Sequence, residues 1–460
     1  MHTNRYRLEY PLKEETLLIN TLNGAIDIIP NELHLLLRQL PHMDEHKLTA
    51  EQMEAVSYLK KRGYIYHSEQ EEDEILEQAM MFARKTEVMQ YVICPTYTCN
   101  FRCPYCFESH DLHEKMSLLT DEQLQEIWKA IDFFHQESGL KKGIINLFGG
   151  EPLLPFTDGI VRKICEKAVE LDFKIGCNTN GYHLPLFVEL LEKYKDRLHL
   201  TITVDGPEHV HDQRRILVGG KGTFQKIDNS ILDVLNRGIS TTVRVNIDKT
   251  NIDSVFSLIE HYKRKELLGR DGFTIHFAPV TDHTCQSTGD NLMQGIEILR
   301  HLHNDISNLE ELEAQQKIVV GSDLYRYIYS VSQLDPELQK KAIPFLPNIV
   351  FCESVQGRSI SFGPDNHMYA CADLIGRAAF KIGDFYPDFH LNEWKWEKWK
   401  QFNSLTIPQC RSCSSAPICG GGCAAEALVV HGNLDQPNCT HAGKQVLSYL
   451  DSIRNELTTI

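Results

Sequence analysis

The run CNFRCPYCFE carries three cysteines in a CxxxCxxC arrangement, Cys99, Cys103 and Cys106. Three thiolates at this spacing hold one corner each of a cubane iron–sulfur cluster, and the fourth iron is left without a protein ligand. Four-cysteine spacings instead close a cubane for electron transfer, and zinc sites usually come as paired CxxC units with four ligands. The triplet therefore predicts a cluster with one iron open to a substrate or cofactor.

A glycine pair and a carboxylate follow the apolar run at residues 144–148. They are Gly149, Gly150, Glu151 and Pro152. Two glycines let the backbone approach a ligand closely, and a carboxylate is suited to accept an ammonium group. The alternative is an ordinary turn, which the preceding cysteine triplet disfavours.

These two motifs resemble the signature of the radical S-adenosylmethionine (SAM) enzymes. The resemblance implies that the amino and carboxylate groups of SAM chelate the open iron of a 4Fe-4S cluster. It also implies that Tyr105 lies against the adenine and that Glu151 accepts the ammonium of the cofactor. The expected chemistry is formation of a 5′-deoxyadenosyl radical, which abstracts a hydrogen atom from an unactivated carbon.

Composition restricts the partners and the compartment. The chain has 460 residues, enough for about three domains, and its 47 basic and 63 acidic residues give a net charge of -16. Such a balance disfavours nucleic acid as a partner. Residues 1–11 lack the apolar segment of a signal peptide, and no apolar run is long enough to span a membrane. We therefore expect a cytoplasmic protein in which most of the 14 cysteines are metal ligands.

A second group of cysteines includes the run CRSCSSAPICGGGC and resembles the SPASM domain, a carboxy-terminal extension of radical SAM enzymes with auxiliary 4Fe-4S clusters. The resemblance implies one cluster held by Cys410, Cys413, Cys419 and Cys439, and a second, with one open iron, held by Cys352, Cys371 and Cys423. Asn366 stands where the family pattern has a glycine, and asparagine also tolerates a left-handed backbone. A zinc ribbon is the alternative, but it leaves three cysteines unexplained.

Four cysteines remain outside the two groups. Cys94, Cys165 and Cys177 lie in apolar patterns typical of small buried side chains. Cys285 lies in a polar segment and is either a fourth ligand to the open auxiliary iron or a free thiol, which is the reading we favour.

The first 70 residues predict a small domain of strands and helices. Strand patterns at 5–10, 16–20 and 25–29 include the Asn23-Gly24 hairpin signal, and helices are expected at 31–40 and 49–62. This layout resembles the winged-helix element by which peptide-modifying enzymes hold a leader peptide. The strand at Tyr64, Ile65 and Tyr66 is the expected edge for β-augmentation by the peptide. The alternative is a generic capping domain.

Strand and helix patterns alternate from Tyr91 to about residue 280, which favours a parallel sheet. Six such units resemble the partial (β/α)6 TIM barrel of the radical SAM family, whose site residues lie at the carboxyl ends of the strands. Matching motifs there place Asn178, Asn180 and Asp205 near the cofactor. Arg244 is suited to grip the carboxylate of SAM with two parallel hydrogen bonds.

The expected organisation is a leader-binding domain at 1–70, a linker helix at 71–90, the barrel at 91–280, a bridging region at 281–350, the SPASM domain at 351–442 and a closing helix at 443–460. This layout resembles thioether-forming maturases of the sactipeptide and ranthipeptide type. It implies a ribosomally made precursor peptide as substrate and flavodoxin or ferredoxin as electron donor. Carbon–carbon cross-linking and a non-catalytic electron carrier remain alternatives. Sulfatase-type oxidation is disfavoured, because Ala372 follows Cys371 where that activity has an aspartate.

Overall fold

The computed structural model describes residues 1–43, 45–83, 87–114, 116–281, 290–305, 317–320 and 347–452, together with residues 312, 315 and 454. The chain forms two compact units. Met1–Lys85, Asp323–Cys352 and Gln401–Ile460 make the first unit, and Thr86–Ser322 and Glu353–Lys400 make the second. The segment expected as one cysteine-rich domain at 351–442 therefore contributes to both units. Cys285 and most of the bridging region expected at 281–350 lie outside the described residues.

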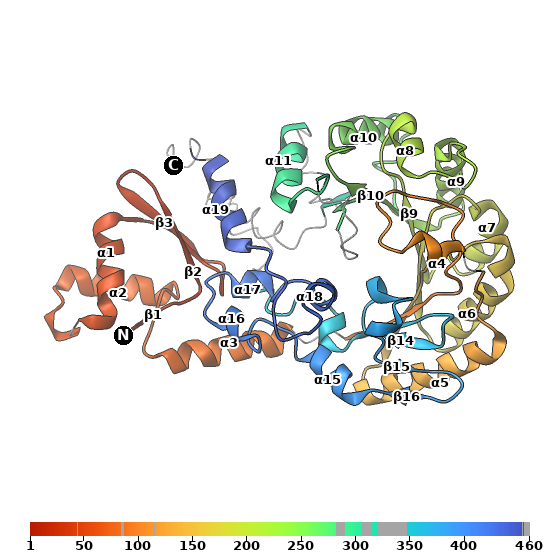
Figure 1. The fold of residues 1–460 in the computed structure, drawn as a ribbon. Helices are drawn as coiled ribbons and strands as arrows, with labels where there is room; N and C mark the ends of the chain where they lie inside the picture. The colour runs from red at the N-terminus through yellow and green to blue at the C-terminus, as the bar shows by residue number, and fades with distance from the viewer. Residues whose placement is uncertain are drawn as a thin grey trace. The chain divides into compact units, whose positions relative to one another are not determined.

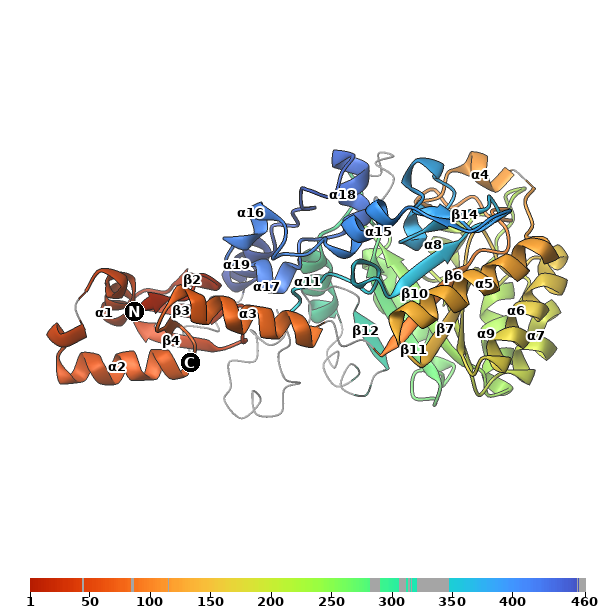
Figure 2. The same ribbon diagram turned by 90° about the horizontal axis from the view of Figure 1, so that it is seen from below.

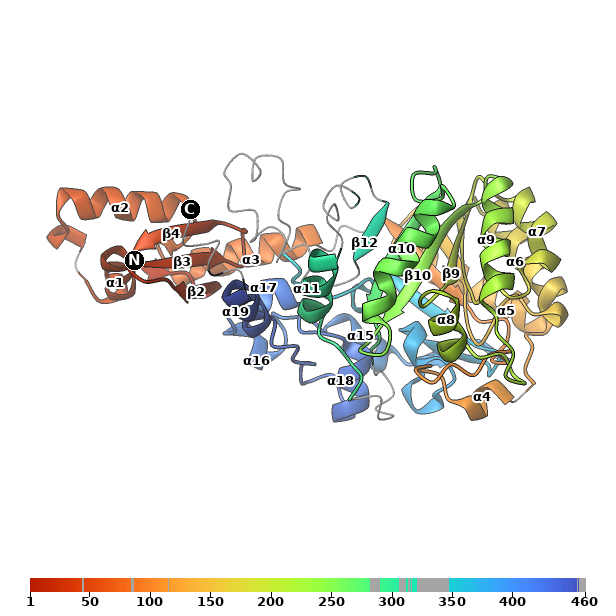
Figure 3. The ribbon, with the colours of Figure 1, turned by 90° about the horizontal axis from the view of Figure 1, so that it is seen from above.

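The second unit is built on parallel strands that pair in chain order and alternate with helices. The strands are β6 (Val88–Ile93), β7 (Lys142–Leu147), β8 (Lys174–Thr179), β9 (Leu198–Thr203), β10 (Ser240–Ile247) and β11 (Phe273–Pro279). The helices are α4 (His110–Glu114), α5 (Asp121–Ser138), α6 (Asp158–Glu170), α7 (Leu184–Lys193), α8 (Glu208–Arg214), α9 (Phe224–Asn236), α10 (Val255–Arg264) and α11 (Gly295–Asp305). Helices α6, α7, α9 and α10 lie along the outside of the strands (Figures 1 and 3). The predicted α/β fold with a parallel sheet is confirmed.

The sheet extends beyond the six expected strands at both edges. β12 (Ile318–Val320) pairs in parallel with β11, and β13 (Ser359–Phe362) pairs in parallel with β6. Three short antiparallel strands continue from β13, namely β14 (His367–Tyr369), β15 (Gly383–Asp384) and β16 (His390–Leu391), and helix α15 (Glu393–Lys400) follows them. A segment from the last third of the chain therefore completes the sheet beside its first strand.

The strands of the barrel have an apolar face and a polar face. On β11, Phe273, Ile275 and Phe277 are buried, and the ring of Phe273 lies 5.3 Å from that of Tyr262 on helix α10. The odd-numbered residues of β11 therefore face the helices, and the alternating residues, such as His276, face the inside of the barrel. Strand β10 alternates in the same way.

The amino-terminal part of the first unit has the expected small fold. The described residues form an antiparallel sheet of β2 (Arg7–Pro11), β3 (Glu15–Asn20) and β4 (Ile26–Pro30), while β1 (His2–Thr3) pairs with β5 (Ile65–Tyr66). Helices α1 (Asn31–Gln39), α2 (Ala50–Lys61) and α3 (Glu69–Ala83) follow in order (Figure 2). Gly24 closes the predicted hairpin with a left-handed φ of 75°. The strands and helices expected in the first 70 residues lie close to their expected positions. The linker helix expected at 71–90 instead spans Glu69–Ala83, and residues 88–90 belong to strand β6.

The carboxy-terminal part of the first unit contacts the amino-terminal sheet. It contains the short helices α16 (Pro408–Arg411), α17 (Ala416–Cys419) and α18 (Ala424–His431), and then α19 (Ala442–Ser452). The hydroxyl of Tyr6 donates to the carbonyl of Arg411 at 2.9 Å, and that of Tyr10 donates to Asp451 at 2.8 Å. Among the described residues, every helix lacks the length and apolar character that a membrane crossing needs.

Two leucines on helix α1 provide a test of the amino-terminal core. Leu37 is fully buried in a cluster with Leu18, Ile29, Leu59 and Tyr64. We expect Leu37→Ala to lower the free energy of unfolding by about 2–5 kcal/mol, because the substitution leaves a cavity. Urea denaturation of the full chain, followed by circular dichroism, measures the change.

The matched control is Leu35→Ala on the same helix, because the side chain of Leu35 is 57% exposed. We expect this control to change the free energy of unfolding by less than about 0.5 kcal/mol. Equal effects of the two substitutions would contradict the described packing of helix α1.

Candidate functional site

The cysteine triplet lies on the loop that follows strand β6. Cys103 is buried and Cys99 and Cys106 are partly exposed. The amide of Cys106 donates to the carbonyl of Cys103 at 3.1 Å, and the amide of Phe101 donates to Sγ of Cys99 at 3.4 Å. The loop therefore turns at residues 103–106, and the Cys99 thiol is held by a backbone amide.

The thiols of the triplet lie in a largely buried environment that raises their pKa values. Burial raises the pKa of the Cys99 and Cys103 thiols, and burial together with Glu108 raises the pKa of Cys106 to about 12. A metal centre must displace these protons, since the thiolate is the ligand. Nearby, Nδ2 of Asn100 and Nε of Arg215 are buried without a hydrogen-bond partner among the described residues. Three clustered thiols beside orphaned donors fit an anionic iron–sulfur group.

The glycine pair supports the cysteine loop. A Cβ atom on Gly149 would lie 2.1 Å from Sγ of Cys94, and one on Gly150 would lie 2.2 Å from the carbonyl oxygen of Tyr97. The amide of Glu151 then donates to the carbonyl of Thr98 at 3.0 Å. The glycines are therefore required for close contact between two backbone segments, in addition to any approach to a ligand.

The carboxylate of Glu151 is buried and held by protein donors. Its Oε1 accepts from Thr179 Oγ1 at 2.6 Å and from the amide of Leu153 at 2.9 Å, and its Oε2 accepts from the amide of Asn180 at 2.6 Å. Burial raises the pKa of Glu151 despite these donors. A carboxylate offers about four acceptor positions, so about one remains for a ligand.

A network of charged residues fixes Tyr105, which stands directly before Cys106. The Tyr105 hydroxyl donates to Asp205 and accepts from Nη1 of Arg215 at 2.7 Å. The guanidinium of Arg214 lies 4.8 Å from the centre of the Tyr105 ring. The other oxygen of Asp205 accepts from the amide of Asn246 at 3.0 Å. Asp205 therefore orients Tyr105 through hydrogen bonds.

Arg244 and His276 occupy neighbouring positions inside the barrel. The two residues pair in register on β10 and β11. Nε of Arg244 donates to Oδ1 of Asn246 at 2.9 Å. Burial lowers the pKa of Arg244, and burial together with the nearby Arg244 lowers the pKa of His276 to about 4. The inside of the barrel therefore holds a cation next to a neutral imidazole.

The two asparagines expected near the cofactor differ in their surroundings. Asn180 is buried, and its Nδ2 donates to Oδ1 of Asn100 on the cysteine loop at 2.7 Å. Asn178 is exposed on strand β8. Asn180 therefore links the end of a strand to the triplet, whereas Asn178 is accessible to a ligand.

The first auxiliary set lies together in the first unit. Burial and the nearby Cys419, Cys413 and Cys439 raise the pKa of Cys410 to about 12. Three successive glycines, 420–422, have left-handed φ values of 66°, 93° and 78°. A Cβ on Gly422 would lie 1.9 Å from the carbonyl of Asn438, so this glycine brings the segment before Cys439 next to Cys419.

The donor geometry bears on the type of metal. Within the described ranges, no group of three or more His, Cys, Asp or Glu side chains is arranged to hold a single metal ion. The assignment of the first set to a cubane, with a zinc ribbon as the alternative, stays a prediction. Cys352 and Cys423 belong to the first unit and Cys371 to the second, and this ligand set stays a prediction.

The expected peptide-binding strand is buried inside its own domain. Tyr64, Ile65 and Tyr66 have exposed fractions of 7% or less, and β5 already pairs with β1 on one side. The Tyr64 hydroxyl donates to the carbonyls of Leu18 and Ala25. Peptide binding at this strand stays a prediction. Because the three side chains are buried, the peptide would have to bind to the strand backbone.

Several residues of the site were not among those expected from the sequence. Arg215 lies in the run HDQRR, and the sequence alone does not show which of its two arginines contacts Tyr105. Thr179 lies between the two predicted residues Asn178 and Asn180, but the sequence does not show that its hydroxyl bonds to Glu151. Asn100 and His276 carried no recognisable signal, because their contacts join segments far apart in the chain.

The chain is similar to several known proteins. Residues 93–261 match the family model of the Radical SAM superfamily. An uncharacterized protein of Archaeoglobus fulgidus is 22% identical over 83% of this chain and 85% of its own length. The GTP 3′,8-cyclase of Sulfurimonas denitrificans is 26% identical over 50% of this chain and 68% of its own length.

Two solved structures share the fold. Streptococcus suis SuiB bound to the precursor peptide SuiA has a TM-score of 0.56 and 15% identity, and covers 95% of this chain and 98% of its own. Native anSMEcpe with bound AdoMet and Kp18Cys peptide also has a TM-score of 0.56, with 16% identity, and covers 81% of this chain and 100% of its own. At these identities the likeness establishes the fold.

Iron quantification tests the two cysteine groups. We expect the anaerobically reconstituted chain to hold about twelve irons, and a Cys99, Cys103 and Cys106 to Ala variant to hold about eight, because one cubane of three is removed. Parallel sulfide and zinc analyses identify the metal. About four irons in the unsubstituted chain, accompanied by zinc, would show that the carboxy-terminal cysteines are structural zinc ligands.

The position of His276 predicts a pH dependence of stability. Its folded pKa of about 4 lies below the ordinary value of 6.5, so the unfolded chain takes up a proton between these pH values that the folded chain does not. This contribution makes the folded state less stable as pH falls from about 6.5 to about 4. We expect the loss between pH 7 and pH 5, measured by urea denaturation, to be smaller in His276→Asn.

The exposed His209 on helix α8 provides the control substitution, His209→Asn. We expect this variant to lose the same stability between the two pH values as the unsubstituted chain. An equal loss in His276→Asn would show that His276 is protonated normally in the folded state.

Proposed function

We propose that the chain, whose residues 93–261 match the Radical SAM superfamily model, is an enzyme that modifies a ribosomally made precursor peptide. The family requires a 4Fe-4S cluster and SAM, which together supply hydrogen-atom abstraction from an unactivated carbon. The observation that carries this proposal is the placement of Cys99, Cys103 and Cys106 beside Tyr105 and Glu151 at the carboxyl ends of parallel strands.

The residues of the chain have distinct roles in this proposal. Cys99, Cys103 and Cys106 hold the cluster, and the buried carboxylate of Glu151 accepts the ammonium of SAM at its remaining acceptor position. Nε of Arg244 is engaged by Asn246. Its terminal guanidinium nitrogens are then the group that binds the SAM carboxylate.

The remaining residues of the site are proposed to position the adenine of SAM. Asp205 and Arg215 orient Tyr105 for contact with the adenine. Gly149, Gly150 and Pro152 follow strand β7 directly, and the close backbone contact of the two glycines with residues 96–98 would hold this segment beside the cofactor.

The peptide substrate is supported by the amino-terminal fold. Strand β4 is an edge of the three-stranded sheet and has five residues, whereas the paired strand β5 has two. An edge strand offers amides and carbonyls to an extended leader peptide. On β4 the carbonyl of Ile26 already accepts from Nη2 of Arg62 at 3.2 Å, so the peptide would use the other groups of this edge or displace Arg62. The backbone of β5 is the second candidate edge. The solved structures of SuiB and anSMEcpe, which share the fold, contain peptides.

Thioether formation is the specific outcome we propose. It rests on a second auxiliary cluster at Cys352, Cys371 and Cys423, whose open iron would bind a substrate cysteine thiolate. Carbon–carbon cross-linking needs no such thiolate and is the alternative within the same class. An electron donor such as flavodoxin or ferredoxin belongs to either proposal.

A nucleotide substrate is the second candidate, because one relative of the chain is a GTP 3′,8-cyclase. That likeness covers 50% of this chain. The net charge of -16 also repels the phosphates of a nucleotide at long range. We therefore favour the peptide.

Cleavage of SAM tests the enzymatic reading. We expect the reconstituted chain, reduced with dithionite, to release 5′-deoxyadenosine, and Cys106→Ala to lose this release by at least about a hundredfold, because the cluster loses a ligand. Chromatography with mass spectrometry measures the product.

Cys165→Ala serves as the matched control, since Cys165 is buried on helix α6 and belongs to neither ligand group. We expect this variant to retain the release. No 5′-deoxyadenosine from the unsubstituted chain would overturn the proposed enzymatic function.

A further inference from the structure

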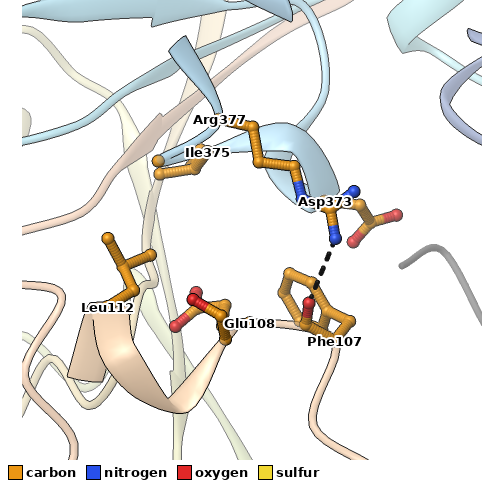
Figure 4. A pocket seen from close by; sticks show the side chains of 8 residues that line it. Phe107, Glu108, Leu112, Asp373, Ile375 and Arg377 are labelled. Carbon is orange, nitrogen blue, oxygen red and sulfur yellow. Dashed lines mark hydrogen bonds between the residues drawn. The ribbon is translucent and has the colours of Figure 1, made fainter. Parts of the chain in front are cut away.

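A small pocket lies beside the cysteine loop in the second unit. Its volume is about 170 Å³, and it is enclosed by residues 107–109 and Leu112 on one side and by Asp373 and residues 375–377 on the other. Figure 4 shows Glu108 and Leu112 facing Ile375 and Arg377 across the space. A Cβ on Gly376 would lie 2.6 Å from Leu112, so this glycine lets the two walls meet. The space is suited to one side chain.

One wall of the pocket carries a buried carboxylate with an unused oxygen. Glu108 is 5% exposed, and its Oε2 lies 2.8 Å from Nε2 of His113, which is 3% exposed. A carboxylate only accepts hydrogen bonds, so Nε2 of His113 donates. Oε1 of Glu108 is buried and has no hydrogen-bond partner within the described ranges. A buried acceptor without a donor costs free energy, which a donating ligand recovers.

The rest of the lining combines apolar and charged groups. Phe107, Leu112 and Ile375 supply apolar walls. Asp373 adds a second carboxylate, and Nη2 of Arg377 donates to the carbonyl of Phe107 at 3.4 Å (Figure 4). Asp373 also lies near Arg244, so Glu108 is the lining carboxylate whose oxygen lacks a partner among the described residues. Such a lining matches a ligand with an apolar stem and a cationic, donating tip.

We propose that this pocket binds a lysine-type side chain of the substrate, with its ammonium donating to Oε1 of Glu108. The proposal rests on the peptide substrate proposed above and specifies one of its side chains. Glu108 directly follows Phe107 and Cys106, so a side chain bound here is held beside the cysteine loop. Glu108 is then a specificity-determining residue.

The test uses two small probes on the reconstituted full chain with SAM. Nα-acetyl-lysine methylamide carries the ammonium, and Nα-acetyl-norleucine methylamide has the same stem without it. Saturation-transfer NMR measures the affinity of each. We expect the lysine probe to bind saturably and at least about tenfold more tightly than the norleucine probe, and Glu108→Gln to remove this preference. Loss of a hydrogen bond to a charged group accounts for that factor.

Two further variants separate binding from folding. Glu122→Gln makes the same change of charge on the exposed face of helix α5 and should keep the preference for lysine. Ile375→Phe fills the pocket without altering a charge and should weaken the lysine probe at least about tenfold. If Glu108→Gln loses iron and therefore its clusters, the affinity of Ile375→Phe for the lysine probe decides whether the pocket binds lysine.

The outcomes distinguish the pocket from the overall function. Equal affinity of the two probes, no saturable binding of the lysine probe, or a full preference for lysine in Glu108→Gln would each overturn the proposed pocket. Release of 5′-deoxyadenosine from the same preparation is measured in parallel. Absence of that product counts against the proposed function, whereas its presence without selectivity for lysine counts against the pocket alone.

Discussion

The close contact of the Gly149–Gly150 backbone with the loop after strand β6 determines the rest of the site. A side chain at either glycine would collide with Cys94 or with backbone atoms of residues 96–98. Because this contact holds the loop against the end of strand β7, the cysteine triplet has a defined position relative to the sheet. The amide of Glu151 then bonds to Thr98, so the carboxylate of Glu151 comes from the same contact.

The polar inside of the barrel follows from the alternation of its strands. Apolar residues on one face of β10 and β11 pack against helices, which leaves Arg244 and His276 on the other face. Neighbouring strands in register bring these two side chains together without any local sequence motif. The low pKa of His276 is a direct consequence, since burial and a neighbouring cation both oppose protonation.

Much of the fold was predictable, because strand and helix periods are local. The hairpin at Asn23-Gly24, the helices of the first 70 residues and the six barrel strands all appear close to their expected positions. The added strands β12 and β13 were not predictable, because they join the sheet through long-range pairing. In the same way, the motifs indicated Tyr105, Glu151 and Asp205, but not Arg215, whose contact with Tyr105 spans 110 residues.

The buried carboxylates of the site differ in how far protein donors occupy their oxygens. Asp205 uses its two oxygens on Tyr105 and on the amide of Asn246, and Glu151 accepts three hydrogen bonds from the protein. These acids therefore act mainly by fixing the strand ends and the aromatic ring beside the triplet. Glu108 differs from both, because one of its oxygens is buried without a donor among the described residues. Glu151 keeps one acceptor position for the proposed cofactor, whereas Glu108 keeps a whole oxygen for the proposed cationic side chain.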